Sequence, residues 1–332
     1  MKRFKTVATL LCALTLAVGA VAFSACGSGD EGVIKGNYKE ATALEMINAV
    51  KAVDEDKLFT PEEGKDALGY ELKANAKLGA SYGGGTLGEQ FELNADAKAE
   101  FKLALKQNEA NGISASSAGS VSFKLKSSLK QLNSLNADAE LYTDDSNVYV
   151  GASIKTVADG AEDSSSFKYK IPFTTIGDII GGIGGMNGFA EEDIYGELGL
   201  EGIVSIAVMA GFKSYIDTSD GLKIKLTADG ETLMTLLAGS DTATAARLAL
   251  GENCRLEIYL AIDANGKFAG FATNSDMSAT VTLAEGESIA VNMKNALSLK
   301  AFAGEIKYPE NLDEYLPLPD FNGDGPITPT AA

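Results

Sequence analysis

The sequence predicts an α+β protein: a large, curved antiparallel sheet of the half-barrel kind, with a few covering helices, behind an N-terminal signal peptide. Long stretches alternate apolar and polar residues with period two, polar turns separate these stretches, and helical periodicity is confined to a few places. No proline-rich linker interrupts residues 38–316, so we expect a single domain there.

The clearest strand runs from Phe91 to Leu105, where apolar residues alternate with charged and amide side chains. Such a strand has one apolar face and one wet face. The same pattern recurs at 121–125, 135–141, 148–154, 167–173, 222–226, 256–262, 281–283, 289–293 and 297–301. Polar turns at 143–147, 218–221, 263–267 and 285–287 predict that most neighbouring strands pair as antiparallel hairpins.

Helical spacing of apolar residues predicts three helices. The first spans Tyr38 to Val53 and leads the fold, and the second follows Gly230. The third runs from Thr242 to Leu250, between an Asp241 cap and Gly251.

The N-terminal residues have the pattern of a targeting signal. Three basic residues precede an apolar run that ends in Phe23, Ser24, Ala25 and Cys26, after which a Gly/Ser/acidic spacer begins. This pattern resembles the lipobox of bacterial lipoproteins, although Phe23 stands where an aliphatic residue is usual. The resemblance implies cleavage of residues 1–25 and a covalent lipid on Cys26. Residues 26–37 would form a flexible tether to the membrane, with the protein at the extracytoplasmic face. An ordinary secretory signal is the alternative.

Composition excludes several classes of function. The chain has 46 acidic and 28 basic residues, a net charge of −18, so we expect no nucleic-acid partner. It has no histidine, which removes Ser-His-Asp and Cys-His catalysis and HExxH zinc sites. The acidic clusters are typical of solvated turns. We expect no enzyme activity and no cofactor other than the N-terminal lipid.

The succession of lipobox, spacer, leading helix, long one-sided strands and a closing segment from Ile306 to Tyr315 resembles the LolA-like and LppX-like half-barrel lipoproteins. The resemblance is architectural and covers roughly residues 38–316, and residues 317–332 would be a disordered tail. It implies an apolar cavity for acyl chains beneath a helical lid, since several family members carry lipids or lipoproteins.

The apolar face therefore either packs as a dry core or leaves space for a lipid or another hydrophobic ligand. Successive alanines on one face and a glycine-rich central segment favour space and a movable lid. The predicted cavity residues are Phe91, Leu93, Ala95, Ala97, Phe101, Leu103, Val148, Val150, Leu222, Ile224, Leu226, Leu256, Ile258 and Leu260. The predicted lid residues are Ile179, Ile180, Gly182, Ile183 and Gly185. With a dry core, the chain would instead be a structural or interaction lipoprotein with an acidic, partner-binding exterior, and the sequence identifies no protein partner.

One metal motif occurs near the C-terminus. Asp320, Asn322 and Asp324 match the first positions of an EF-hand-like calcium loop, but Ala331 stands where the bidentate acid belongs. The motif is more typical of a disordered, turn-forming tail than of a calcium site.

Overall fold

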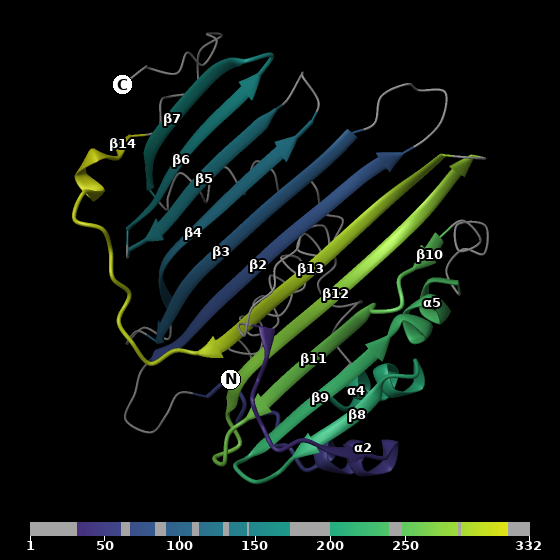
Figure 1. Cartoon of the computed structure of the whole chain (residues 1–332). Helices are drawn as coiled ribbons and strands as arrows, with labels where there is room; N and C mark the ends of the chain where they lie inside the picture. Colours follow the sequence, from purple (N-terminus) through teal and green to yellow (C-terminus); the bar gives the residue numbers. More distant parts are fainter. Residues whose placement is uncertain are drawn as a thin grey trace, which may run out of the picture.

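The computed structural model describes residues 32–60, 67–83, 91–107, 113–128, 133–144, 146–172, 200–238, 248–284 and 287–317. Within these ranges most residues lie in strands, and the strands form one large, open, curved sheet (Figure 1). Every strand pair in the described part is antiparallel except β7 with β14. The sheet-dominated, mostly antiparallel fold that the sequence predicts is therefore confirmed.

The sheet has 14 strands in the order β1-β8-β9-β11-β12-β13-β2-β3-β4-β5-β6-β7-β14, and β10 pairs with β12. The strands of the first half are β1 (Lys39–Ala41), β2 (Ala67–Gly83), β3 (Phe91–Gln107), β4 (Ile113–Ser127), β5 (Ser134–Thr143), β6 (Asn147–Ala158) and β7 (Ala161–Pro172). Those of the second half are β8 (Lys213–Asp217), β9 (Leu222–Asp229), β10 (Leu248–Leu250), β11 (Arg255–Ile262), β12 (Phe268–Ala284), β13 (Glu287–Ala301) and β14 (Leu316–Pro317). The helices within the described residues are α2 (Ala43–Lys51), α4 (Leu200–Met209), α5 (Gly230–Ala238) and the 3-10 turn η3 (Leu312–Glu314).

Two runs of neighbouring strands meet in the middle of the sheet. Strands β2 to β7 pair each with the next, and β8, β9, β11, β12 and β13 form the other run. Strand β13 joins the runs by pairing Ser288–Ala301 with Tyr70–Gly83 of β2. Segments more than 200 residues apart are thus neighbours at the centre.

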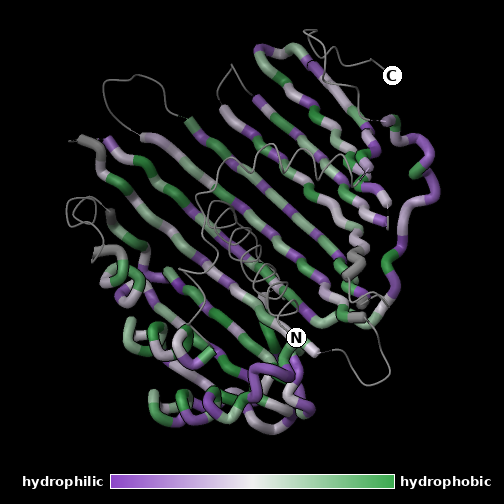
Figure 2. Tube along the Cα trace, turned by 180° about the vertical axis from the view of Figure 1, so that it is seen from behind, coloured by the Kyte–Doolittle hydropathy of each residue, from purple (hydrophilic) through white to green (hydrophobic). Residues whose placement is uncertain are grey.

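The register divides the sheet into one apolar and one polar face, because opposite residues of an antiparallel pair point to the same side. One row on the apolar face is Ile224, Leu260, Phe271, Leu299 and Leu72. The matching row on the polar face is Lys225, Tyr259, Ala272, Ser298 and Lys73. Figure 2 shows this alternation along the strands as changing colour.

Helix α2 covers the apolar face at the β1–β8 edge. Thr42 caps it, since the Thr42 hydroxyl accepts the Glu45 N–H and the Glu45 carboxylate accepts the Thr42 N–H at 2.8 Å. Met46 and Val50 are buried and pack with Val204 of α4 against Ile224 and Leu226 of β9. Helix α5 adds Leu233, which packs with Ala228 and Cys254.

The structure confirms most predicted strands and corrects the helices. The leading helix predicted from Tyr38 begins at Ala43, because Lys39–Ala41 first pair with β8 as a strand. The helix predicted over 242–250 is wrong at its end, where Leu248–Leu250 form β10 and pair with β12. Backbone pairing there outweighs a weak helical period. The helix predicted after Gly230 is confirmed as α5.

Candidate functional site

The predicted cavity residues share one face of the sheet but fall into two regions. Those on β9 and β11 lie beneath the helices, where Ile224 and Leu226 are buried with Met46, Val50 and Val204. Leu222, Ile258 and Leu260 pack against that cluster, and Leu256 packs against the Leu233 cluster. These six residues therefore contribute to a packed core beneath the helices, and their role as lining of a ligand cavity stays a prediction.

The other predicted residues lie on β3 and β6, in a region that we call the apolar wing: the apolar faces of β3 to β7. Phe101, Gly119, Leu141, Val150 and Tyr169 form one row across it. The most extensive helix-to-strand contacts of the described residues lie on β1, β8 and β9. The helix-bearing core clusters also include side chains of β11 and β12, and none of β3 to β7. The wing thus belongs to the part of the apolar face that the described helices leave open.

Side-chain exposure on the wing agrees with this placement. Val121, Ile154 and Phe167 are 37%, 42% and 43% exposed, although all three lie on the apolar face. Of the cavity residues that the sequence predicts on the wing, Ala95 is buried. The others are half-buried: Phe91, Leu93, Ala97, Phe101, Leu103, Val148 and Val150.

Short side chains occupy the middle of the wing. Ala99 faces Val121, which faces Ala139, which in turn faces Ala152. Phe167 completes the row opposite Ala152 and stacks on Tyr169 with ring centroids 5.4 Å apart. The result is a floor of alanines that Val121 interrupts and Phe167 ends.

Two buried polar atoms interrupt the apolar face at the centre of the sheet. The Asn295 Nδ2 donates to the Ser275 hydroxyl at 3.0 Å, but its Oδ1 has no hydrogen-bond partner. The Tyr82 hydroxyl is also buried without a partner, and the Tyr82 ring stacks on Phe91. A buried polar atom without a partner costs about 1–3 kcal/mol, so each of these two groups destabilises the centre of the sheet.

The polar face carries the chain that leads into the fold. Gly32 lies against Ala296 of β13, Ile34 against Gly270 of β12, and Tyr38 against the Tyr259 ring of β11. The Asn37 N–H then donates to Asp217 at 2.8 Å. Residues 32–38 thus cross the polar face as a strap, which Figure 1 shows in purple in front of the sheet.

Charged and aromatic side chains gather next to this strap. Glu257 is buried and its carboxylate accepts from Lys225 at 2.6 Å, from Arg255, and from the Tyr259 hydroxyl at 2.9 Å. Burial alone would raise the pKa of Glu257, but the hydrogen bonds from Lys225, Tyr259 and Arg255 outweigh it and lower the pKa. Burial and the nearby carboxylates of Asp217 and Glu257 raise the pKa of Tyr38 to about 12.

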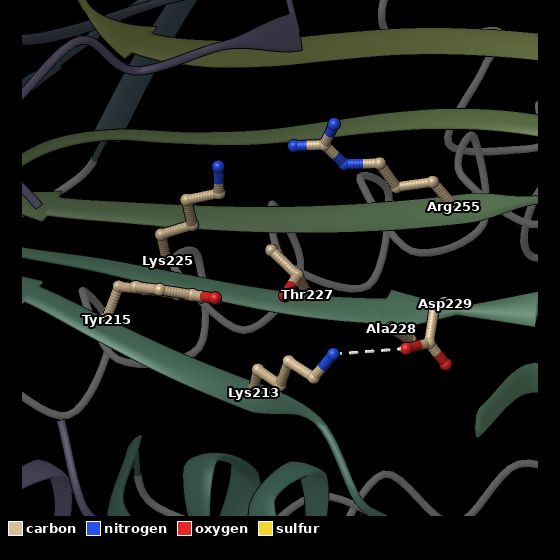
Figure 3. A pocket seen from close by; sticks show the side chains of 7 residues that line it. All are labelled: Lys213, Tyr215, Lys225, Thr227, Ala228, Asp229 and Arg255. Carbon is tan, nitrogen blue, oxygen red and sulfur yellow. Dashed lines mark hydrogen bonds and ion pairs between the residues drawn. The ribbon is translucent and has the colours of Figure 1, made fainter. Parts of the chain in front are cut away.

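These residues border two hollows on the polar face. The first has a volume of about 240 Å³ and is lined by Lys213, Tyr215, Lys225, Thr227, Ala228, Asp229 and Arg255 (Figure 3). The second, of about 290 Å³, is lined by Asn253, Arg255, Glu257, Asn274, Ser275, Asp276 and Lys294. Neither coincides with the predicted apolar cavity.

Other predicted site residues lie outside the described residues. These are the cleavage residues Phe23, Ser24 and Ala25, the lipid attachment at Cys26, the lid residues Ile179, Ile180, Gly182, Ile183 and Gly185, and the calcium-loop residues Asp320, Asn322 and Asp324. Within the described ranges, no three His, Cys, Asp or Glu side chains gather as metal ligands. No helix in the same ranges is long and apolar enough to cross a membrane.

Comparisons with known proteins add little to this geometry. No protein-family model and no curated protein matches the chain. Among solved structures, the chain is similar to the translocator domain of the autotransporter NalP from Neisseria meningitidis. That similarity has 8% identity and a TM-score of 0.13, over 78% of this chain and 96% of that one. A TM-score this low supports no inference about the chain. The fold class is therefore defined by the sheet alone, which is large, open and mostly antiparallel, with one apolar and one polar face.

Sequence reasoning missed the polar hollow of Lys213, Lys225 and Arg255. Lys213 and Arg255 are 42 residues apart in the sequence. Each of the three residues has the pattern of an ordinary solvent-exposed strand face. Only the pairing of β8 with β9 and of β9 with β11 places them together.

Proposed function

We propose that the protein is a membrane-anchored, extracytoplasmic lipoprotein whose apolar wing binds a lipid or another hydrophobic ligand. The observation that carries the proposal is the wing itself, an apolar face in register over five strands that the described helices leave open. No catalytic step is part of the proposal.

Apolar surface in contact with water favours binding. Burying it stabilises a complex by about 25 cal/mol per Å², and each buried methylene of an acyl chain contributes about 0.8 kcal/mol. The alanine floor formed by Ala99, Ala139 and Ala152 leaves space above the sheet that longer side chains would fill. An extended acyl chain lying along the strands suits this shape.

The finer architecture belongs to the same proposal. The half-barrel lipoproteins that the sequence resembles hold acyl chains between a curved sheet and covering helices. Here α2, α4 and α5 cover the β8–β9 end, and the wing extends beyond them. The packed end would hold the fold together while the wing binds the ligand.

The strap limits how the protein would sit on its membrane. Gly32 follows the proposed lipid-bearing Cys26 by six residues. A chain of that length spans at most about 20 Å, at roughly 3.3–3.6 Å per residue. Because the strap lies on the polar face, an anchored molecule would turn that face, near β12 and β13, toward the lipid surface.

The proposal is tested by measuring the lipid that accompanies the purified protein. The full chain is produced in bacteria, purified in a non-ionic detergent, extracted with organic solvent and analysed by mass spectrometry. We expect non-covalent acyl lipid at near-stoichiometric amounts for the wild type. I154Q, on the wing, should lower this amount at least fivefold.

The matched control is S153Q, which changes the adjacent, exposed residue on the polar face of the same strand. It should retain the wild-type amount of lipid. Equal lipid in both variants, or none in the wild type, would exclude the wing as a ligand site.

A second function is favoured by one observation. Ile203, Ile206 and Met209 of α4 are 57%, 56% and 86% exposed, so this helix presents an apolar patch away from the core. Such a patch fits a protein partner. A structural or interaction lipoprotein would use α4 as its contact surface for a protein partner. Replacing Met209 by the uncharged, polar Gln (M209Q) would then abolish binding of that partner and leave the amount of bound lipid unchanged.

A further inference from the structure

The first hollow of the polar face has the composition of an anion receptor, which is unexpected in a chain of net charge −18. Lys213 comes from β8, Lys225 from β9 and Arg255 from β11, and Asp229 is the acidic residue of the lining. Figure 3 shows Lys213 reaching Asp229 on one side of Thr227, while Lys225 and Arg255 extend on the other side.

Two carboxylates near the hollow, Glu257 and Asp229, are already engaged, whereas Glu40 lies opposite Tyr215 on β1 and is exposed to solvent. Both oxygens of Glu257 accept hydrogen bonds, from Lys225 and Arg255 at Oε1 and from Tyr259 at Oε2. Asp229 accepts from Thr232 at Oδ1 and from Lys213 at Oδ2, at 3.2 Å. Among the groups in direct contact, three cations thus share two carboxylates, which leaves one positive charge in excess there.

Donor hydrogens are also in excess. An ammonium has three N–H groups and a guanidinium has five, more than these two carboxylates accept. In the described part of the chain, the hydroxyls of Tyr215 and Thr227 make no hydrogen bond to protein, and both line the hollow. Charge-assisted donors and hydroxyls on three adjacent strands suit a group with several acceptor oxygens.

We propose that this hollow binds a phosphate group. A phosphate offers three or four oxygens to the donors of Lys213, Lys225, Arg255, Tyr215 and Thr227, whereas a carboxylate offers two. The hollow of about 240 Å³ accepts such a group but is small for a whole drug-sized ligand. The site is separate from the apolar wing, since its residues lie on the opposite face of the sheet.

The acidic surroundings set the strength of binding. Asp276 lies opposite Arg255 on β12 and pairs with Lys294 at 2.7 Å, so it does not remove the excess charge. More distant carboxylates are screened beyond about 8 Å at physiological ionic strength. Salt above that concentration also screens the attraction between the cations of the hollow and the phosphate, so binding weakens as more salt is added.

The test is a calorimetric titration of the full chain, in non-ionic detergent at about 0.15 M ionic strength, with inorganic phosphate. We expect one saturable site. The double variant K213Q/R255Q should bind at least tenfold more weakly. The control K77Q/K300Q removes two positive charges from the same face outside the hollow and should stay within twofold of the wild type.

A further variant keeps every charge in place. Y215F removes the unused hydroxyl and retains the ring beside Lys225, so it tests the site even if K213Q/R255Q fails to fold. We expect a severalfold loss of affinity. Absence of saturable binding to the wild type, an equal loss in K77Q/K300Q, or unchanged binding by Y215F would overturn the proposal.

The source of the phosphate is distinguished with two more probes. Glycerol 3-phosphate stands for a soluble phosphate ester, and nanodiscs containing phosphatidic acid present the same group on a lipid surface. Preference for the first, lost in K213Q/R255Q, assigns a soluble ligand. Preference for the nanodiscs, lost in the same variant, assigns a headgroup, and both results support the phosphate site.

Discussion

At the scale of single residues, Gly119 and Phe101 show how tightly the wing is packed on its own strands. The two residues are opposite each other on β4 and β3, and the Phe101 ring lies over Gly119. A Cβ at position 119 would lie 2.0 Å from the ring. G119A should therefore destabilise the fold by about 1–3 kcal/mol in chemical denaturation.

A matched glycine provides the control for this prediction. A Cβ on Gly79 of β2 would meet only Asn94 Oδ1, at an ordinary 3.5 Å. G79A should change the free energy of unfolding by less than about 0.5 kcal/mol, as surface substitutions usually do. If G119A were equally harmless, the Phe101 ring would not lie where the structure places it.

Asp217 ties the strap to the sheet and gives a second prediction at this scale. Hydrogen bonds from the Ser219 hydroxyl, the Ser219 N–H and the Asn37 N–H lower the pKa of Asp217 from 3.8 to about 2. Because the folded-state pKa is depressed, the stabilisation is complete above pH 4 or so and is lost as the pH falls through about 2.

D217N should therefore be less stable than the wild type at pH 7, and the difference should shrink between about pH 4 and pH 2. Denaturation midpoints measured across that range check it. D220N, which changes an exposed aspartate of the same turn, should follow the wild type. A constant gap between D217N and the wild type down to pH 2 would show that the carboxylate charge is not what holds the strap.

At the scale of elements, α2 is held by one face. Met46 is fully buried against β9 and α4, whereas Leu44 on the same helix is 69% exposed. M46A should cost about 2–5 kcal/mol, the usual range for truncating a buried methionine. L44A should cost less than about 0.5 kcal/mol. Thermal or urea unfolding measures both, and similar values for the two would contradict the docking of α2.

Elements also show what the sequence could predict and what it could not. Strand β3 was predictable because apolar and polar residues alternate strictly over Phe91–Leu105, as expected for a strand with one apolar face. Strand β2 has equally clear alternation, from Leu68 through Tyr70 and Leu72 to Tyr82, and could have been found by the same rule. Strand β12 carries Thr273 and Ser275 on its apolar face, which hides its period.

Tertiary pairing explains the remaining differences. Leu248–Leu250 become a strand only because β12 lies beside them, and no local signal records that neighbour. The division of the predicted cavity into a packed core and an open wing depends on where Met46 and Val204 dock. These side chains belong to helices that are far from the strands in the sequence. The alternation of apolar and polar residues therefore predicted which residues share a face, but not which of them the helices cover.

At the scale of the whole molecule, the sheet separates two kinds of chemistry by face. The apolar wing would take a hydrophobic ligand, and the polar face carries the strap and the basic hollow. With a lipid anchor at Cys26, the polar face would lie toward the membrane and the wing away from it. This arrangement would keep a bound acyl chain clear of the bilayer that anchors the protein.

The central claim is that the wing holds the ligand, and photo-crosslinking tests it most directly. A fatty acid carrying a diazirine near its chain end is bound to the purified full chain and activated by light, and the labelled peptides are identified by mass spectrometry. The account predicts labels on β4 to β7, at residues such as Val121, Ile154 and Phe167. Labels confined to α4, or no labels above those of a denatured control, would contradict it.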